Sequence, residues 1–146
     1  MKERLNIRRA RSSHASIIAE LCAQLGYPST VTQIQHRLRQ LVPASKHAVF
    51  VAETRAAGVV GWVHVSVSSL LESDRRAEVN GLVVADGHRS LGAGAKLLEA
   101  AEAWARRHGC KGTNVRSNII RERAHAFYLR QGYEHYKTQK AFRKSL

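Results

Sequence analysis

Apolar residues recur at helical spacing in several parts of the chain, and this periodicity predicts amphipathic helices. The segments with this pattern are 14–25, 31–41, 92–108 and 121–131. Ser12 and Ser13 stand before the first segment and are residue types that cap helix N-termini, and Thr30 or Thr32 fits the same role before the second. Gly26 is expected to end the first helix, because glycine adopts the left-handed conformation of a C-cap without strain.

Other segments are rich in β-branched and aromatic residues, which is typical of strands. They are 5–11, 47–54, 58–71, 77–85 and 112–118, with one or two further strands in 133–146. The segment 78–117 has the strand–helix–strand order of a parallel crossover. The pattern therefore predicts a single α/β (α+β) domain over residues 1–146, with a mixed central sheet of about six or seven strands and about four helices.

Charge is the feature of the composition that adds most to this picture. The chain has 24 Lys and Arg against 11 Asp and Glu, a formal net charge of +13 at pH 7. Such an excess attracts polyanions, whether nucleic acid, an acidic protein or a cofactor that carries phosphate. The basic residues are scattered and form no block typical of a nucleic-acid-binding arm, so a solvated basic surface is the default interpretation.

The spacing of the cysteines and histidines and the length of the apolar runs argue against several classes of protein. Cys22 and Cys110 are far apart and lack a metal-binding spacing, so neither a disulfide framework nor a zinc site is predicted. The 8 histidines show no H-x-x-x-H pair, and no protein-bound metal is expected. No apolar run approaches the length of a membrane span and the N-terminus lacks the apolar core of a signal peptide, so we expect a soluble, cytoplasmic protein.

The sequence HRSLGAG at 88–94 lies between a predicted strand and the longest predicted helix. A helix N-terminus leaves backbone N–H groups unpaired, and the pattern assigns these donors to residues 90–95. Gly92 and Gly94 keep the donors sterically open, and Arg89 adds a cation beside the positive end of the helix dipole. These features predict a site for a pyrophosphate. The alternative is a plain turn whose glycines only relieve backbone constraints.

Two common phosphate-binding motifs do not fit this segment. A Walker loop requires Lys and Ser/Thr after its last glycine, whereas Gly94 is followed by Ala95 and Lys96. A Rossmann G-x-G-x-x-G requires a glycine where Leu97 stands. What remains is R-x-x-G-x-G, beginning at Arg89, after a strand that ends L-x-V. This pattern resembles the acetyl-CoA signature of the GNAT N-acetyltransferase superfamily, and the order of the predicted elements resembles that family as well.

A second segment, AHAFYLRQGY at 124–133, resembles the family's A-x-x-F-Y-x-x-x-G-F/Y segment. It follows the first by one predicted strand and one predicted helix, so the resemblance extends over essentially the whole chain. The chain departs from the pattern at Asp86, where a proline is frequent, at Ser90, and at Arg121, where an asparagine is frequent and Asn118 stands nearby. These departures concern the contacts to the cofactor and leave the fold unaffected.

The resemblance implies acetyl-CoA as co-substrate and a primary amine, of a small molecule or a protein, as acceptor. It implies that a backbone N–H at or near Val84 polarises the thioester carbonyl. The cofactor-binding residues that it implies are Leu82, Val83, Val84, Arg89, Ser90, Leu91, Gly92, Ala93, Gly94, Ala95, Asn118 and Arg121.

Acetyl transfer from a thioester to an amine also requires a proton donor for the thiolate that leaves. Tyr128 occupies the position of the general acid in the family that the chain resembles, and a phenol donates a proton without being charged beforehand. The alternative role of Tyr128 is packing beside Phe127 in the core. In the same way, Trp62 and Trp104 sit in apolar patterns and are interpreted as packing residues.

The reaction requires, in addition, a base that makes the amine neutral. Glu78 is the candidate, since strand alternation places it on the same face as Leu82 and Val84, and a glutamate at this distance is the base in some relatives that the chain resembles. The alternative is an ordinary polar residue near the start of a strand. A hairpin centred near Leu71 would place His64 opposite Glu78 as a relay partner.

Alternative functions stay open at this stage. A basic nucleic-acid-binding module would use the same glycine-rich helix start on backbone phosphates, but the chain lacks a recognition helix and interleaved aromatic residues, so a nucleic-acid partner is not expected. A domain that binds acyl-CoA without catalysis is a further alternative. Because the late strands in 133–146 have edges that a partner can cover, a homodimer is possible.

Overall fold

The structure, a computed structural model, describes residues 4–146 and, for Ser90, the backbone alone. Contacts within the chain divide it into two compact units, Met1–Val115 and Arg116–Leu146. The first unit contains β1 (Leu5–Arg9), the 3-10 helix η1 (Ser12–His14), α1 (Ala15–Leu25), α2 (Val31–Leu41), β2 (His47–Thr54), β3 (Gly58–Ser68), β4 (Arg76–Val84), the 3-10 helix η2 (Asp86–Leu91), α3 (Ala93–Arg107) and β5 (Thr113–Val115). The second contains α4 (Glu122–Arg130). None of the helices in residues 4–146 has the length and hydropathy needed to cross a membrane.

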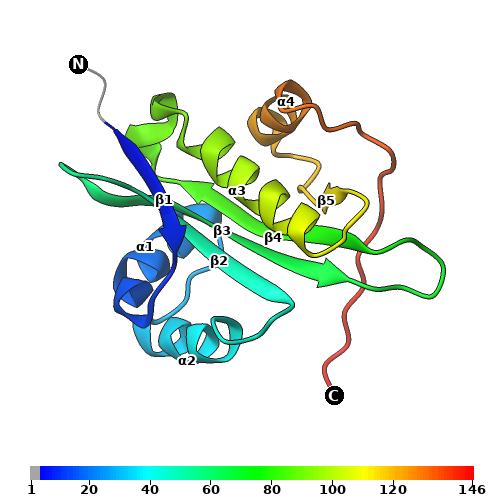
Figure 1. Cartoon of the computed structure of the whole chain (residues 1–146), viewed down its shortest axis with the longest axis horizontal. Coiled ribbons are helices and arrows are strands. Elements are labelled where there is room, and N and C mark those ends of the chain that lie inside the picture. The colour runs from blue at the N-terminus through cyan, green and yellow to red at the C-terminus, as the bar shows by residue number, and fades with distance from the viewer. Residues whose placement is uncertain (1–3) are drawn as a thin grey trace. The chain divides into compact units, whose positions relative to one another are not determined.

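The first unit is built on a mixed sheet with the strand order β1-β2-β3-β4-β5 (Figure 1). Neighbouring strands from β1 to β4 run antiparallel, whereas β5 runs parallel to β4. The connection from β4 to β5 passes through α3, so the predicted parallel crossover is confirmed. A crossover of this kind brings the start of its helix to the end of the first strand, and this arrangement places the glycine-rich segment after β4.

Helices cover both faces of this sheet (Figure 1). Residues of α1 and α2 form one core cluster with side chains of β2, β3 and β4, among them Val51 and Trp62. On the opposite face α3 lies over β3 (Figure 1), where Leu97 of α3 is fully buried. Trp62 and Trp104 are 9% and 1% exposed, which agrees with their interpretation as packing residues.

Gly61 lets α3 approach the sheet closely. A Cβ atom at Gly61 would lie 2.8 Å from the backbone oxygen of Val83 and 3.1 Å from Cδ1 of Leu97. We expect Gly61→Ala to lower the free energy of unfolding by about 1–3 kcal/mol, because the backbone and the helix must shift to admit the methyl group. Urea denaturation measures this change. Gly87→Ala is the control, since a Cβ there meets nothing within 4 Å.

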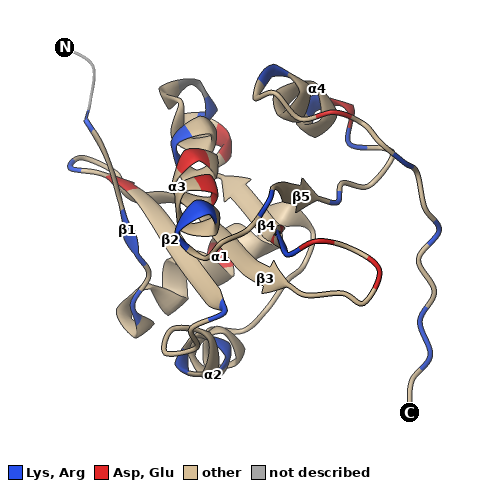
Figure 2. Cartoon of the chain, turned by 45° about the vertical axis from the view of Figure 1, so that its right-hand side comes forward, with Lys and Arg blue, Asp and Glu red and all other residues tan. Residues whose placement is uncertain are grey.

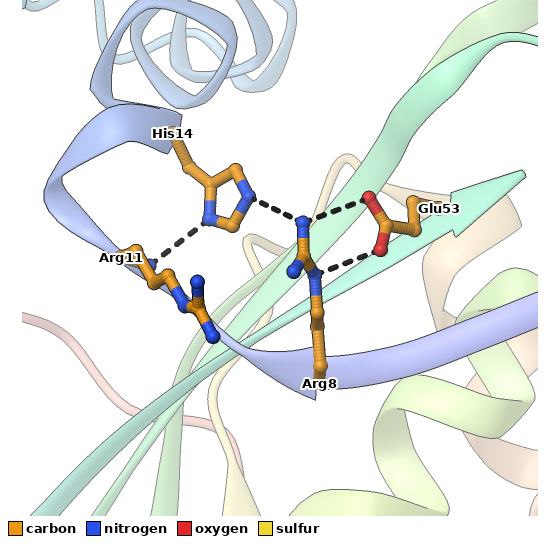
Figure 3. Close-up of polar contacts among 4 residues, drawn as sticks. All are labelled: Arg8, Arg11, His14 and Glu53. Carbon is orange, nitrogen blue, oxygen red and sulfur yellow. Dashed lines mark hydrogen bonds and ion pairs between the residues drawn. The ribbon is translucent and has the colours of Figure 1, made fainter.

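The start of α1 differs from the expectation. Ser12 and Ser13 lie inside η1, and the N-cap of α1 is His14, so the predicted serine cap is wrong. The Nδ1 atom of His14 instead accepts a hydrogen bond from the backbone N–H of Arg11 at 3.0 Å (Figure 3). A buried imidazole therefore orders this turn in place of a serine hydroxyl.

An ion pair joins β1 to β2 beside this turn (Figure 3). The Nε atom of Arg8 lies 2.7 Å from a carboxylate oxygen of Glu53, and its Nη2 atom lies 3.2 Å from the Nε2 atom of His14. Burial lowers the pKa of His14, and the positive charge of Arg8 lowers it further. Because a neutral imidazole does not repel the guanidinium, the turn and the ion pair are compatible at neutral pH.

The caps of the two N-terminal helices otherwise follow the sequence. Thr30 accepts the backbone N–H of Gln33 at 3.1 Å, and the Gln33 side chain accepts the backbone N–H of Thr30 at 2.9 Å. Gly26 follows α1 with a φ of 96°, the left-handed conformation that glycine adopts without strain. The capping predictions for Thr30 and Gly26 are therefore confirmed.

The predicted α/β fold class is confirmed, but the sheet has five strands among the described residues instead of about six or seven. The difference lies in 133–146, where residues 134–146 form neither strand nor helix and are exposed. A strand requires a neighbour for its ladder of hydrogen bonds, and this segment has no strand partner in the part of the chain that the structure describes. The prediction of one domain over 1–146 is not tested and stays a prediction.

Candidate active site

The glycine-rich segment forms an open helix N-terminus at the start of α3. Gly92 has a φ of 77°, a conformation that favours glycine, and its carbonyl accepts the first helical hydrogen bond, from the N–H of Lys96 at 3.1 Å. Among the side chains that the structure describes, none caps this end of α3. The N–H groups of Ala93, Gly94 and Ala95 precede that first helical bond, and such donors are available to an anion.

The structure corrects the extent of this set of donors. Ser90 and Leu91 belong to η2, a separate 3-10 turn, and not to the first turn of α3. The chain reverses its backbone conformation at Gly92 between the two helices, which is why periodicity alone extended the donors back to residue 90. The unpaired N–H groups of the α3 N-terminus, the candidate cradle, therefore begin at Gly92, whereas the predicted cofactor contacts of Ser90 and Leu91 stay predictions.

Arg89 lies in η2, immediately before this cradle, and already has a partner. Its Nη2 atom is 2.7 Å from Oδ1 of Asp86, and the two side chains are 39% and 73% exposed. An ion pair so open to water contributes about 0–1 kcal/mol. Because the pair is weak and exposed, Arg89 can exchange Asp86 for another anion at little cost in free energy.

This arrangement gives a prediction for Arg89. We expect Arg89→Ala to raise the KM for acetyl-CoA by more than it lowers kcat, since a contact to the cofactor phosphates is shared by the ground and transition states. Initial rates at varied acetyl-CoA concentration separate the two constants. A loss confined to kcat would contradict the phosphate role. Arg106→Ala, at the other end of α3, is the control.

One edge of β4 is free along the half of the strand that leads to the cradle. β5 pairs with β4 only from Ala77 to Val79, and among the described residues no strand pairs with Leu82, Val83 or Val84 on that side. An unpaired strand edge presents backbone N–H and C=O groups in a row, which suits the amide groups of an extended ligand. The cofactor-binding residues predicted on β4 thus lie on a free edge that runs toward α3.

A β-bulge in β4 corrects the predicted position of Glu78. Val65 pairs with Val79 and His64 with Gly81, so Asn80 is an extra residue that inverts the alternation of the strand. Glu78 therefore shares its face with Gly81 and Val83, and not with Leu82 and Val84 as strict alternation predicts. This is the face of the sheet that α1 and α2 cover.

Glu78 stands in a row of polar residues that crosses the sheet on this face. Paired residues on successive strands are His47, Ser66, Glu78 and Asn114. The amide of Asn114 lies 3.5 Å from a carboxylate oxygen of Glu78, and no ion pair of Glu78 occurs within residues 4–146. A partly buried carboxylate with only a neutral neighbour is suited to receive an ammonium group.

The proposed pairing of His64 with Glu78 is wrong. Ser66 lies opposite Glu78, because the hairpin between β3 and β4 is centred at residue 72 and not at Leu71. His64 instead contacts His47, whose Nδ1 atom lies 3.0 Å from its Nε2 atom. Sequence analysis missed His47, and nothing in its spacing to His64 gave a signal, since the contact depends on the register of β2 against β3.

The loop between β3 and β4 adds acidic groups to the same end of these strands. It contains Glu72 and Asp74, which appear in red in Figure 2, and with Leu71, Ser73 and Arg76 they line a shallow depression. The charge of these two carboxylates is opposite in sign to the net charge of the chain. The depression therefore offers a ligand two carboxylates together with the guanidinium of Arg76.

Tyr128 lies on α4, in the second unit, within a cluster of aromatic rings. Its ring centroid is 5.3 Å from that of Phe127 and 5.9 Å from that of Tyr133. Burial raises the pKa of Tyr128, and Arg121 partly offsets this effect. The phenol therefore carries its proton at neutral pH, which a general acid requires.

Asn118 and Arg121 serve the local structure before α4. The side-chain oxygen of Asn118 accepts the backbone N–H of Ile120 at 3.2 Å, and its backbone oxygen accepts that of Arg121 at 2.9 Å. Arg121 is the N-cap residue of α4. The predicted cofactor contacts of these two residues are not tested by this geometry and stay predictions.

Comparison with known proteins identifies the family. A model of the Acetyltransferase (GNAT) family matches residues 16–133. The chain belongs to this family. The resemblance seen in the motifs is thereby confirmed, and the family match includes β4, the cradle and α4.

Individual relatives of this GNAT chain are more distant. An aminoalkylphosphonate N-acetyltransferase of Salmonella typhimurium is 37% identical over 86 residues, which cover 57% of this chain and 56% of that protein, little more than half of its length. A solved aminoglycoside N-acetyltransferase in complex with CoA has a TM-score of 0.88 at 17% identity, with 100% of this chain and 98% of that chain covered. Glucosamine-6-phosphate N-acetyltransferase from Arabidopsis thaliana has a TM-score of 0.82 at 17% identity, with 98% and 100% covered. At these identities the two structures show the fold alone.

Proposed function

We propose that this protein is an acetyl-CoA-dependent N-acetyltransferase that acts on a primary amine by direct attack on the thioester. The observation that supports this most is the free edge of β4, which leads directly to the uncapped N-terminus of α3. An extended arm with amide groups fits the first feature and a pyrophosphate fits the second, and CoA has both. Family membership and the solved relative in complex with CoA support the same cofactor.

The residues then have the following roles. Glu78 receives the ammonium group and accepts its proton, so that the neutral nitrogen attacks the thioester carbon. A backbone N–H at or near Val84 stabilises the oxyanion. The tetrahedral intermediate collapses, the bond between carbon and sulfur breaks, and Tyr128 donates its phenolic proton to the thiolate.

For the acceptor we favour a small primary amine that also carries a phosphonate or phosphate group. The relative with 37% identity acts on aminoalkylphosphonates, and a net charge of +13 attracts an anionic molecule. The carboxylates of Glu78, Glu72 and Asp74 suit the ammonium end of such a molecule. A polycationic aminoglycoside, the substrate class of one solved relative, is the second candidate, supported by the same acidic groups.

An assay of CoA release tests this function. Purified protein is mixed with acetyl-CoA and, in separate reactions, aminomethylphosphonate, glucosamine-6-phosphate or neamine, and free thiol is followed. We expect release above the background hydrolysis with the phosphonate. Thermal stabilisation by CoA without release for any amine would favour the alternative, an acyl-CoA-binding domain that is not catalytic. Stabilisation by DNA instead of CoA would favour nucleic-acid binding.

Glu78→Gln provides a test of the base. The variant keeps the size of the side chain but cannot accept a proton, so its kcat/KM should fall at pH 7 and recover in part above pH 9, where more of the amine arrives neutral. The measurement is a pH–rate profile from pH 6 to 10. A profile parallel to that of the wild type would make Glu78 a structural carboxylate. Glu99→Gln, at an exposed position of α3, is the control.

Association into a homodimer also stays a proposal. The segment 134–146 is exposed and has no strand partner among the described residues, so its backbone groups are available to a second chain. Light scattering at micromolar concentration with acetyl-CoA present decides between a dimer and a monomer.

A further inference from the structure

Two imidazoles contact each other at the edge of the polar row. Nδ1 of His47 lies 3.0 Å from Nε2 of His64, and the ring planes are inclined by 25° with their centroids 5.2 Å apart. A separation of 3.0 Å is that of a hydrogen bond, so one proton lies between the two nitrogens. Both rings are partly buried, one on β2 and the other on β3.

A hydrogen-bonded pair of neutral imidazoles has two ends of different character. One outer nitrogen carries a lone pair, and the outer nitrogen of the other ring carries a proton. When the first end accepts a proton, the shared proton moves across and the second end releases one. The pair can therefore carry a proton from one end to the other and is neutral both before and after the transfer.

The surroundings of the pair favour the neutral form of His64, which this transfer requires. Burial, and after it the neighbouring His47, lowers the pKa of His64 to about 4, so His64 is neutral at pH 7 and retains a lone pair. Other titratable groups on the elements around the pair are Glu20 of α1, His36, Arg37 and Arg39 of α2, Lys46 before β2, and Arg76 and Glu78 of β4.

The polar row connects this pair to Glu78. Ser66 is the cross-strand neighbour of both His47 and Glu78, and such neighbours have Cβ atoms about 5 Å apart. The Ser66 hydroxyl accepts a hydrogen bond from the amide of Asn80, the bulge residue, at 2.8 Å. A serine O–H rotates about its C–O bond, so the Ser66 hydroxyl has the chemistry to bridge the carboxylate and the imidazole.

We infer that the His47–His64 pair is the proton exit of the acceptor site. The N–H bond of the acceptor ammonium breaks and its electron pair stays on nitrogen. Glu78 takes the proton and Ser66 transmits it to the outer lone pair of the imidazole pair, which releases a proton from its other end to solvent. His47 and His64 are positioning and relay residues, since they act through Glu78. This inference rests on the proposed function.

The test uses His64→Gln and His47→Gln, which retain hydrogen-bonding groups but cannot relay a proton. With aminomethylphosphonate and saturating acetyl-CoA, we expect kcat/KM for the amine to fall about tenfold or more at pH 7 and to approach the wild-type value above pH 9. The KM for acetyl-CoA should not change. His135→Gln, on the exposed segment 134–146, is the matched control.

Each outcome has one meaning. Folded variants with the kcat and pH profile of the wild type overturn the relay and leave the proposed function intact. A wild-type protein that releases no CoA with any amine overturns both. If the variants do not fold, the wild type is measured in mixtures of H₂O and D₂O. A curved dependence of kcat on the deuterium fraction supports a relay of several protons, and a linear one overturns it.

Discussion

Replacing Gly92 with aspartate should weaken the binding of acetyl-CoA by about 30-fold or more, equivalent to about 2 kcal/mol. The carboxylate would stand at the N-terminus of α3, where it repels the pyrophosphate and competes for the N–H groups of Ala93 and Gly94. Isothermal titration calorimetry with acetyl-CoA measures the loss directly and does not require knowledge of the amine.

The control for this variant is Gly92→Ala. Both substitutions place a side chain at a φ of 77°, which costs about 1–2 kcal/mol of stability, and a Cβ atom there meets nothing within 4 Å. Backbone strain is therefore common to the two variants, and the charge separates them. If alanine weakens acetyl-CoA binding as much as aspartate does, strain at Gly92 and not repulsion explains the loss. Unchanged affinity of a folded Gly92→Asp variant would reject the cradle assignment.

Local features of the sequence predicted the corresponding parts of the structure well. The helices over 31–41 and 92–108 lie within about one residue of their observed bounds, because apolar periodicity and capping are properties of neighbouring residues. The candidate cradle lies at the start of the second of these helices, α3, so its place in the sequence was predicted. The helix η2 and the left-handed conformation at Gly92 between η2 and α3 were not predicted.

Features that depend on pairing between strands were not predicted. The bulge at Asn80 adds one residue to β4, and this single residue transfers Glu78 to the opposite face from Leu82. Nothing local to Asn80 marks it as a bulge, because the extra residue is defined only by the register of β3 against β4. The contact of His47 with His64 was missed for the same reason.

The last segment of the chain shows another limit of local patterns. The sequence at 133–146 alternates weakly and was predicted to contain strands, but a strand exists only where a neighbour completes its hydrogen bonds. The segment holds 4 Lys and Arg among its 14 residues, and its apolar residues Tyr136 and Phe142 are 66% and 91% exposed. The segment therefore buries too little apolar surface to favour a strand without a partner.

Replacing Tyr128 with phenylalanine should lower kcat by about 10²-fold and leave the affinity for acetyl-CoA nearly unchanged. The ring and its contacts with Phe127 and Tyr133 remain, so the aromatic cluster is preserved and only the proton donor is lost. Because its pKa is raised, the wild-type phenol is protonated throughout the neutral range, and the defect should be the same at pH 6 and pH 8. Steady-state kinetics with aminomethylphosphonate at saturating acetyl-CoA give the two constants.

Tyr133→Phe is the matched control, because it removes a phenol from the same cluster. We expect it to keep kcat within about threefold of the wild type, which is far less than the loss of a general acid. Equal losses in the two variants would trace the effect to the stability of the cluster around α4. Full activity of Tyr128→Phe would mean that its hydroxyl takes no part in expelling the thiolate. Water, or another donor, would then protonate the sulfur, and Tyr128 would be a packing residue beside Phe127.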